Sequence, residues 1–490
     1  MKRLSGLDAT FLYMETPTSP MHVMGVLLLD TKTAPEGYSF EKVREMLLSR
    51  IHLMPAFRRR LVPVPLGLAH PVWIEDAEFD LDNHLHRIGV PPPGDLRALE
   101  GVVGDIAGRT LDRGKPLWDM WVVEGLKDDR AAVITKMHHS TIDGTSGADV
   151  MVHLLDVTPE ISKPEPPDAP FAGERRPSDL RLLGGALAAQ AGTPVRAVKA
   201  VGKLGGNAVR TARGYLQKEM REASPPPFSA PRTRFSGALS PHRAVGFGGA
   251  SLDDLKEIKA AFDGKVNDVV LAIATHAMRD YLEWLGELPD RPLVASCPIS
   301  VRKEGGEGEE ARDSANQVSN MLVPLPVQMK DPVKRLKTII QSTRRSKELA
   351  NAIGAETLMD WAEFLAPRLF TTGMRLYSAT RMGNLHPPAL NLIVSNVPGP
   401  PIPLYSAGAR IVAIYPMGPL LPGAGINITV LSNMGNVDFG VIADRETVPE
   451  VWRIAEGLKE GVAVLLAAAR APKRKPAAKP GSRKKAAAGA

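Results

Sequence analysis

Apolar residues recur along the first third of the chain in short runs that alternate with longer helical stretches. Runs at Met21–Asp30, Trp121–Glu124 and Ala131–His139 are separated by helical periodicity at Phe40–Ile51 and Leu96–Arg109. Short runs rich in β-branched residues predict strands, whereas apolar spacings of three and four predict amphipathic helices. The pattern predicts a mixed α/β unit over residues 1–156.

The same alternation returns after residue 245 and predicts a second α/β unit over residues 246–470. The expected helices follow Val266-Asn267-Asp268 and cover Asp331–Ala350, Thr357–Arg381 and Val448–Ala469; the expected strands are Leu293–Cys297, Leu390–Val397, Ala409–Tyr415, Gly425–Ser432 and Val437–Ala443.

Residues 157–245, between the two units, have a different composition. Prolines gather at both ends of this segment, while Leu180–Arg221 mixes alanine, glycine and small apolar residues with arginine and lysine. Proline-rich stretches are typical of linkers. The central part predicts one or two basic amphipathic helices, which either dock on a lipid surface or pack between the units.

The formal charge of +7 arises in the C-terminal tail. Seven of the 61 basic residues lie in residues 471–490, which hold no acid, so the remaining 54 match the 54 acidic residues. A neutral body argues against a nucleic-acid-binding fold, and the Lys/Ala/Pro tail is expected to be disordered.

Cysteine content and hydropathy bear on the compartment. A single cysteine, Cys297, excludes an intrachain disulfide and fits a reducing compartment. Neither a secretory apolar region nor a run of about 18 apolar residues is evident. We therefore expect a cytoplasmic protein with at most peripheral contact to the inner membrane face or to lipid droplets. Cys297 itself is expected to be a buried small hydrophobe.

The strongest chemical signal is His138-His139-Ser140-Thr141-Ile142-Asp143-Gly144, which follows the apolar run Ala131–Ile134. Adjacent side chains on a strand point to opposite faces, so only one imidazole should face a given pocket. An imidazole with a pKa near 6.5 is suited to removing a proton from an attacking hydroxyl. The segment therefore indicates acyl transfer to an alcohol, without an enzyme nucleophile.

Other interpretations of this segment are a metal pair and a packed, non-catalytic pair. The two histidines should diverge and a third ligand is not evident, which disfavours a metal site. Asp143 could simply bond to nearby backbone groups of the turn. By composition, two histidines, an aspartate and a glycine at this spacing arise by chance in roughly one chain in a thousand.

The segment resembles the His-His-x-x-x-Asp-Gly signature of the bacterial bifunctional wax ester synthase/acyl-CoA:diacylglycerol acyltransferase family. Further matching stretches lie along most of the chain: Leu4-Ser5-Gly6-Leu7-Asp8, Pro20-Met21-His22, Pro116-Leu117-Trp118, Asn267-Asp268, Ser395-Asn396-Val397-Pro398-Gly399-Pro400 and Gly425-Ile426-Asn427-Ile428. Residues 157–240 and the tail lack such a match.

The resemblance implies the two-lobed α/β fold of CoA-dependent acyltransferases, shared with chloramphenicol acetyltransferase and condensation domains, with the active-site channel between the lobes. It implies that His139 is the general base and His138 supports the site. Asp143 would hold the loop, and Gly144 would permit the turn. Acyl-CoA would be a substrate, so neither a cofactor nor a metal is expected.

Four further residues are candidates for the substrate channel. Asn267 is either an N-cap or, with Asp268, part of the channel. Ser395 and Asn396 either end a strand before a Pro-Gly turn or supply polar contacts to the channel. Pro116-Leu117-Trp118 is expected to pack rather than bind.

The resemblance implies transfer of a long acyl chain from acyl-CoA to diacylglycerol or to a fatty alcohol. The alternatives are a condensation-type enzyme with another acceptor and an inactive relative that binds lipid droplets. A Gly-x-x-x-x-Gly-Lys phosphate loop does not occur in the sequence, so the CoA site is not assigned by motif.

Overall fold

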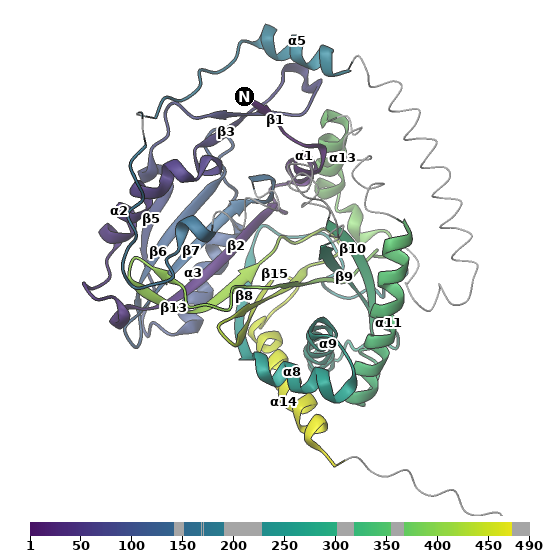
Figure 1. The fold of residues 1–490 in the computed structure, drawn as a ribbon. Coiled ribbons are helices and arrows are strands. Elements are labelled where there is room, and N and C mark those ends of the chain that lie inside the picture. The colour runs from purple at the N-terminus through teal and green to yellow at the C-terminus, as the bar shows by residue number, and fades with distance from the viewer. Residues whose placement is uncertain are drawn as a thin grey trace, which may run out of the picture.

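Two six-stranded sheets and one three-stranded sheet frame the protein (Figure 1). The computed structural model describes residues 1–141, 151–167, 169, 171–190, 228–300, 318–353 and 367–472. The expected mixed α/β class is confirmed, with one large sheet in each half of the molecule.

The first large sheet carries the histidine segment near its middle. Its strand order is β12 (Tyr405–Ser406), β13 (Ala409–Met417), β2 (His22–Asp30), β7 (Arg130–His138), β6 (Trp118–Leu126) and β5 (Leu85–Gly89), with only the β5–β6 pair parallel. Helix α2 (Phe40–Arg50) covers one face, and α3 (Leu96–Gly108) covers the other. Side chains of Ser39 and Asp95 cap these two helices.

The second large sheet packs against a layer of helices. Its strand order is β10 (Val318–Leu325), β9 (Leu293–Ser300), β11 (Leu392–Val397), β14 (Ile426–Asn433), β15 (Asn436–Asp444) and β8 (Arg243–Ser251). The helices are α8 (Leu252–Phe262), α9 (Val266–Trp284), α11 (Pro332–Ile353) and α14 (Trp452–Arg470). Cys297 is buried in this core, as expected, and burial raises the pKa of its thiol to about 12.

Strand β13 crosses from the second half of the sequence into the first sheet, where it pairs with β2. The apolar pattern places this run in the second unit, whereas in the structure it pairs within the first large sheet. Ile411 and Ile414 pack into the core beneath α2, whereas Ala413 and Tyr415 pack into the core beneath α3. Since β2 is apolar on both faces, pairing with β13 keeps it from forming an open sheet edge.

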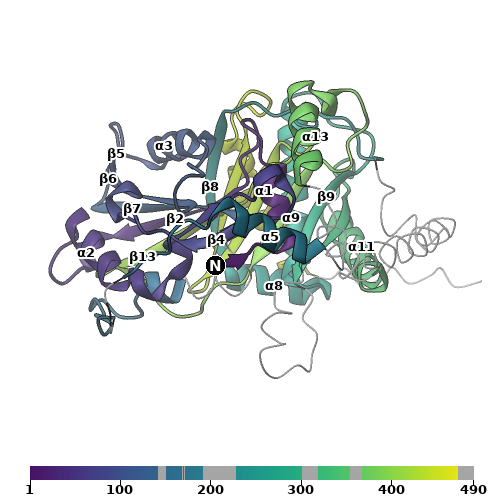
Figure 2. The same ribbon diagram turned by 90° about the horizontal axis from the view of Figure 1, so that it is seen from above.

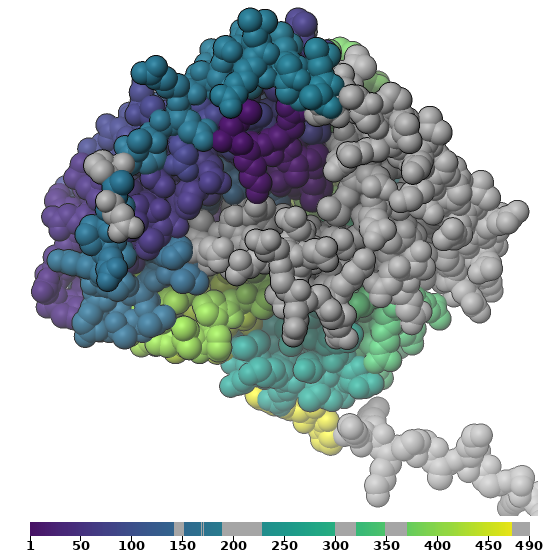
Figure 3. All heavy atoms as spheres, turned by 45° about the horizontal axis from the view of Figure 1, so that its top comes forward, coloured from purple at the N-terminus to yellow at the C-terminus, as the bar shows by residue number. Residues whose placement is uncertain are grey.

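A cap of smaller elements lies over the junction of the two halves. The third sheet, β1 (Lys2–Arg3), β4 (Val72–Glu75) and β3 (Arg59–Val62), lies beside α5 (Asp179–Gln190). Helix α1 (Gly6–Met14) contacts α13 (Pro367–Ala379), and the two lie side by side seen from above (Figure 2). The N-terminal segment, in dark purple, forms part of the surface below α5 (Figure 3).

The expected linker and the expected basic helices have other limits in the structure. Strand β8 begins at Arg243, inside the segment expected to be a linker. Of the expected basic helices, the structure describes α5, while residues 191–227, 354–366 and 473–490 lie outside the described residues. The boundaries between the units stay a prediction. Among the described helices, none is long and apolar enough to cross a membrane.

Candidate active site at the end of strand β7

Backbone pairing fixes the two histidines at the end of β7. His138 lies opposite His22 in the β2–β7 register. The His138 amide donates to the Leu117 carbonyl at 3.0 Å, and the His139 amide donates to the Met21 carbonyl at 2.8 Å. Because β7 is held between two antiparallel neighbours, its last residues have little freedom to change direction.

The imidazole of His138 is buried and held in one tautomer. Its Nδ1 accepts the Ser140 amide hydrogen at 3.1 Å and lies 2.7 Å from the Ser140 hydroxyl. A backbone amide only donates, so the ring proton of neutral His138 lies on Nε2, which is 3.7 Å from Glu15 Oε1. Burial lowers the pKa of His138 to about 3. This histidine is therefore neutral and firmly oriented.

Glu15 connects His138 to a second buried histidine and to an arginine. Its carboxylate lies 3.2 Å from His22 Nε2 and forms an ion pair with Arg113. Burial alone would raise the pKa of Glu15, but the close contact with His22 and the charge of Arg113 lower it to about 2. Glu15 is an anion that aligns both imidazoles.

Sequence reasoning did not identify Glu15, and it named His22 only as part of a matching stretch. The Glu15 carboxylate lies at the C-terminal end of α1. Its distance along the chain from His22 and His138 follows no known local motif. The only signal for this cluster is the pairing of β2 with β7, which sets His22 against His138.

His139 has different surroundings from His138. Its ring stacks on Phe11 of α1, with ring centroids 3.8 Å apart and an interplanar angle of 13°. Burial lowers the pKa of His139, an effect that its own backbone carbonyl opposes. The side chain keeps partial exposure, and its buried Nδ1 has no hydrogen-bond partner among the described residues. The ring is thus neutral near pH 7 and able to accept a proton.

An apolar cavity of about 350 Å³ lies along the β7 face that leads to His139; we call it the apolar cavity. Alternate residues Val133, Thr135 and Met137 of β7 line it, and His139 begins the 3₁₀ turn His139–Thr141 that directly follows this strand. Helix α2 forms the opposite wall through Val43, Met46 and Leu47, and strands of the second half close it through Val397, Ile414 and Leu431. The cavity suits an alkyl chain.

The other sequence-predicted residues have different outcomes in the structure. Asp143 and Gly144 fall in residues 142–150, so their roles stay predictions. Ser395 and Asn396 are half-buried near the end of β11, and Ser395 shares a strand face with Val397 of the apolar cavity. Leu117 and Trp118 are buried, and the Trp118 indole donates to the Phe57 carbonyl, so this stretch packs as expected.

The interpretation of Asn267 as the N-cap of α9 is wrong. Lys265 is the N-cap residue, and Asp268 accepts the Lys265 amide hydrogen at 2.8 Å. The other oxygen of Asp268 accepts the Thr343 hydroxyl at 2.6 Å. Both carboxylate oxygens of Asp268 therefore have structural partners, while Asn267 is half-buried at the second position of the helix.

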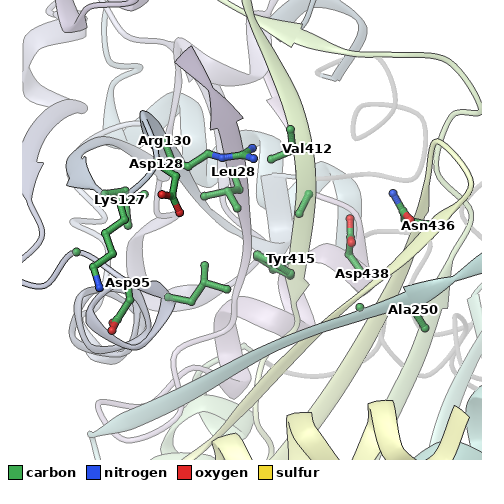
Figure 4. A pocket seen from close by; sticks show the side chains of 15 residues that line it. Leu28, Asp95, Lys127, Asp128, Arg130, Ala250, Val412, Tyr415, Asn436 and Asp438 are labelled. Carbon is green, nitrogen blue, oxygen red and sulfur yellow. The ribbon is translucent and has the colours of Figure 1, made fainter. Parts of the chain in front are cut away.

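A polar cavity of about 600 Å³ lies at the opposite end of β7, beside Arg130 (Figure 4). Its walls carry Lys127 and Asp95 from one half and Tyr415 and Asp438 from the other, and burial raises the pKa of Asp438 to about 6. A strand rises about 3.3 Å per residue, so roughly 26 Å separate Arg130 from His138. This cavity is not part of the histidine site.

One group of metal-type side chains occurs among the described residues, formed by His276, Asp280 and Glu460. Arg335 donates to His276 Nδ1 at 2.9 Å, and His276 Nε2 lies 3.1 Å from Asp280. A guanidinium beside the ring opposes a cation, and the neutral ring's proton lies on the nitrogen that faces the acid. The group fits a hydrogen-bonded ion pair rather than a metal site.

Comparison with known proteins relates both halves of the chain to the same family. Residues 4–270 match the family described as wax ester synthase/diacylglycerol acyltransferase catalytic domain, and residues 314–465 match the WS/DGAT C-terminal domain. A putative diacylglycerol O-acyltransferase of Mycobacterium tuberculosis is 39% identical over 467 residues, covering 95% of this chain and 90% of the relative. A probable diacylglycerol O-acyltransferase of the same species, tgs2, is 34% identical and covers 93% and 96%.

Solved structures agree with this relationship. The wax ester synthase/diacylglycerol acyltransferase from Marinobacter aquaeolei VT8 is 27% identical with a TM-score of 0.67, covering 96% of this chain and all of that chain. A starter condensation domain of rhizomide synthetase is 13% identical with a TM-score of 0.52, covering 96% and 94%. The second likeness shows the fold alone, and together they confirm the two-lobed acyltransferase fold.

Proposed function

This chain belongs to the wax ester synthase/diacylglycerol acyltransferase family, and from that premise we propose that it transfers an acyl group from acyl-CoA to a hydroxyl. The acceptor is diacylglycerol or a fatty alcohol, and the product is a triacylglycerol or a wax ester. His139 is the general base. The observation that carries this assignment is the position of His139, a half-buried imidazole with a lowered pKa in the turn directly after β7, whose residues Val133, Thr135 and Met137 line the apolar cavity.

In the reaction, His139 takes the proton of the acceptor hydroxyl as its oxygen attacks the thioester carbon. The carbon–oxygen bond forms, the carbon–sulfur bond breaks, and the imidazolium returns a proton to the departing CoA thiolate. General base catalysis of this kind contributes on the order of 10²–10⁴-fold. His138, with a pKa of about 3 and its Nδ1 already accepting from Ser140, is poorly suited to the same task.

The apolar cavity holds a long alkyl chain of one of the two substrates. Methionine and branched side chains line it, and Thr135 and Ser406 are its polar members. Each buried CH₂ contributes about 0.8 kcal/mol to binding. A chain along β7 would place its reactive end near His139, because the lining residues of this strand lead to that position.

We propose peripheral contact with a lipid surface, since these acceptors partition into membranes and droplets. Leu180 and Leu187 of α5 are 82% and 61% exposed, and Arg181 lies between them. Exposed leucines beside arginine favour contact with an anionic lipid interface. A cytoplasmic location agrees with this proposal.

The direct test replaces His139 with alanine and measures transfer of radiolabelled acyl groups to diacylglycerol, hexadecanol and hexadecylamine. We expect activity on the two hydroxyl acceptors to fall by at least about a hundredfold, with an unchanged melting temperature. His52→Ala, a half-buried histidine elsewhere, serves as the control. Near-normal turnover by His139→Ala would exclude the base role, and preference for the amine would favour a condensation-type enzyme.

A further inference from the structure

A cavity of about 1000 Å³ lies where α1, α13 and the segment before β8 meet; we call it the arginine cavity. Its wall begins at Glu15, which contacts His138, and continues through Thr16 and Thr18. The Thr18 hydroxyl lies 3.0 Å from the Ser378 hydroxyl of α13. The cavity therefore extends from the buried histidine cluster to the exposed end of α13.

Four of the described arginines line this cavity, and two of them are neutralised. Arg113 forms an ion pair with Glu15, and Arg234 forms one with Glu287. Arg375 and Arg381 are exposed and form no ion pair with another described residue. The cavity thus holds two guanidinium groups whose charge is available to a ligand.

The acidic residues of the wall do not cancel these two charges. Asp444 is fully buried, where it accepts amide hydrogens from Ser240 and Thr447 and lies 3.8 Å from Arg243. Glu446 is exposed, and among the described lining residues it is the only carboxylate without such partners. The arginine cavity therefore carries a net positive charge.

The available arginines are spaced for an extended anion. Arg375 and Ser378 are three residues apart and share one face of α13, and Arg381 follows three residues later at the N-cap of the 3₁₀ turn Met382–Asn384. Two guanidinium forks with a hydroxyl between them match phosphate groups, because arginine binds phosphate through paired, charge-assisted hydrogen bonds.

We propose that the arginine cavity binds the phosphate-bearing part of coenzyme A, with Arg375 and Arg381 contacting its phosphates. This proposal rests on the proposed function. The donor carries several phosphates at one end and the thioester at the other, and the cavity likewise joins a cationic mouth to the histidine cluster. Since the sequence has no glycine-rich phosphate loop, side chains must supply the positive charge.

The test compares two acyl donors that differ only in the nucleotide. Steady-state kcat/KM is measured with palmitoyl-CoA and with palmitoyl-pantetheine, which lacks the phosphates, for Arg375→Gln, Arg381→Gln and the double variant. Glutamine removes the charge and the guanidinium donors while keeping a polar side chain at these exposed sites. Arg410→Gln is the matched control, because Arg410 is exposed on the far end of β13 and does not line the cavity.

Each single variant should lower kcat/KM for palmitoyl-CoA by about tenfold or more, and the double variant should reduce the preference for palmitoyl-CoA over palmitoyl-pantetheine by about a hundredfold. The double variant should also bind adenosine 3′,5′-bisphosphate more weakly in calorimetry. An unchanged donor preference, or an equal loss with both donors, would overturn the proposal. If wild-type protein transfers no acyl group at all, the proposed function fails, and bisphosphate binding alone then decides the arginine assignment.

Discussion

The apolar cavity and the arginine cavity approach the end of β7 from different sides and differ in almost every physical respect. The first is lined by methionine and aliphatic side chains and reaches the face that ends at His139. The second is lined by arginines and hydroxyls and begins at Glu15, which contacts His138. Two environments of opposite polarity thus lie close to the end of β7.

This difference follows from the alternation of a β-strand. Val133, Thr135 and Met137 point toward α2, while Ile134 and Lys136 point toward α3, where the Lys136 ammonium donates to the carbonyls of Ile106 and Arg109. One strand therefore separates a face that lines the apolar cavity from a face that packs into the core beneath α3, where Lys136 is a buried charged member.

Among changes at the histidine cluster beside the arginine cavity, Glu15→Gln should lower the rate the most. Loss of the anion removes the partner that aligns His22 and His138, and a misplacement near 1 Å costs roughly a hundredfold in rate. We expect that loss in kcat, measured at saturating palmitoyl-CoA. Glu36→Gln, on an exposed loop before α2, is the control. A rise in KM with normal kcat would mean that Glu15 serves donor binding and not the position of the histidines.

Met46→Trp should affect the apolar side alone. The larger ring would shorten the apolar cavity, so kcat/KM with palmitoyl-CoA should fall by about tenfold relative to octanoyl-CoA, in line with roughly 1–3 kcal/mol for one or two excluded methylenes. Leu48→Trp lies on the exposed face of the same helix and should leave the chain-length preference unchanged. Equal loss with both donors would show that the acyl chain of the donor lies elsewhere.

The buried histidine cluster should make stability depend on pH. Burial holds the pKa of His138 near 3 in the folded protein, below its usual value of 6.5. The unfolded chain therefore binds the proton first, so stability is present above pH 6.5 and is lost as pH falls toward 3. The loss is about 1.4 kcal/mol per pH unit.

Denaturant unfolding at several pH values would measure this dependence. His138→Asn should make it less steep, with His22 and His139 accounting for the remainder, whereas His242→Asn, at an exposed histidine, should leave it unchanged. Glu15 affects stability at lower pH. Its pKa of about 2 is depressed, so its contribution to the free energy of unfolding is present above pH 4.5 and is lost as pH falls toward 2. A pH-independent stability between 6.5 and 4 would contradict the buried cluster.

Local patterns identified the strand and the histidines because both are encoded in consecutive residues. An apolar run followed by imidazoles predicts a strand that ends at a site, and β7 ends at His138. Glu15 was missed because its contact depends on the register of β2 against β7, which no local pattern contains. The pairing of β13 with the first sheet was not foreseen for the same reason: its apolar run suits either sheet equally.

The arginines of α13 were missed for a different reason. On a helix, exposed basic residues usually mark a solvated face. Arg375 and Arg381 can be recognised as a candidate site only in the folded protein, where α13 lies against α1 and the Thr18–Ser378 contact closes the wall of the arginine cavity. The candidate channel residues at the start of α9 illustrate the converse case. Of the polar pair Asn267-Asp268, Asp268 has a local structural role, which is to cap the helix.

Asp268→Ala should therefore have the smallest effect, and it tests whether α9 adds a third wall to the two cavities. Loss of the cap and of the Thr343 contact should lower the free energy of unfolding by about 1–2 kcal/mol. The KM values for both substrates, measured below the lowered melting temperature, should stay within about twofold. Asp253→Ala, in the exposed first turn of α8, is the matched control and should change stability by a few tenths of a kcal/mol. A clear shift in acceptor KM would place the start of α9 in the channel after all, because a helix cap remote from substrate has no means of altering acceptor binding alone.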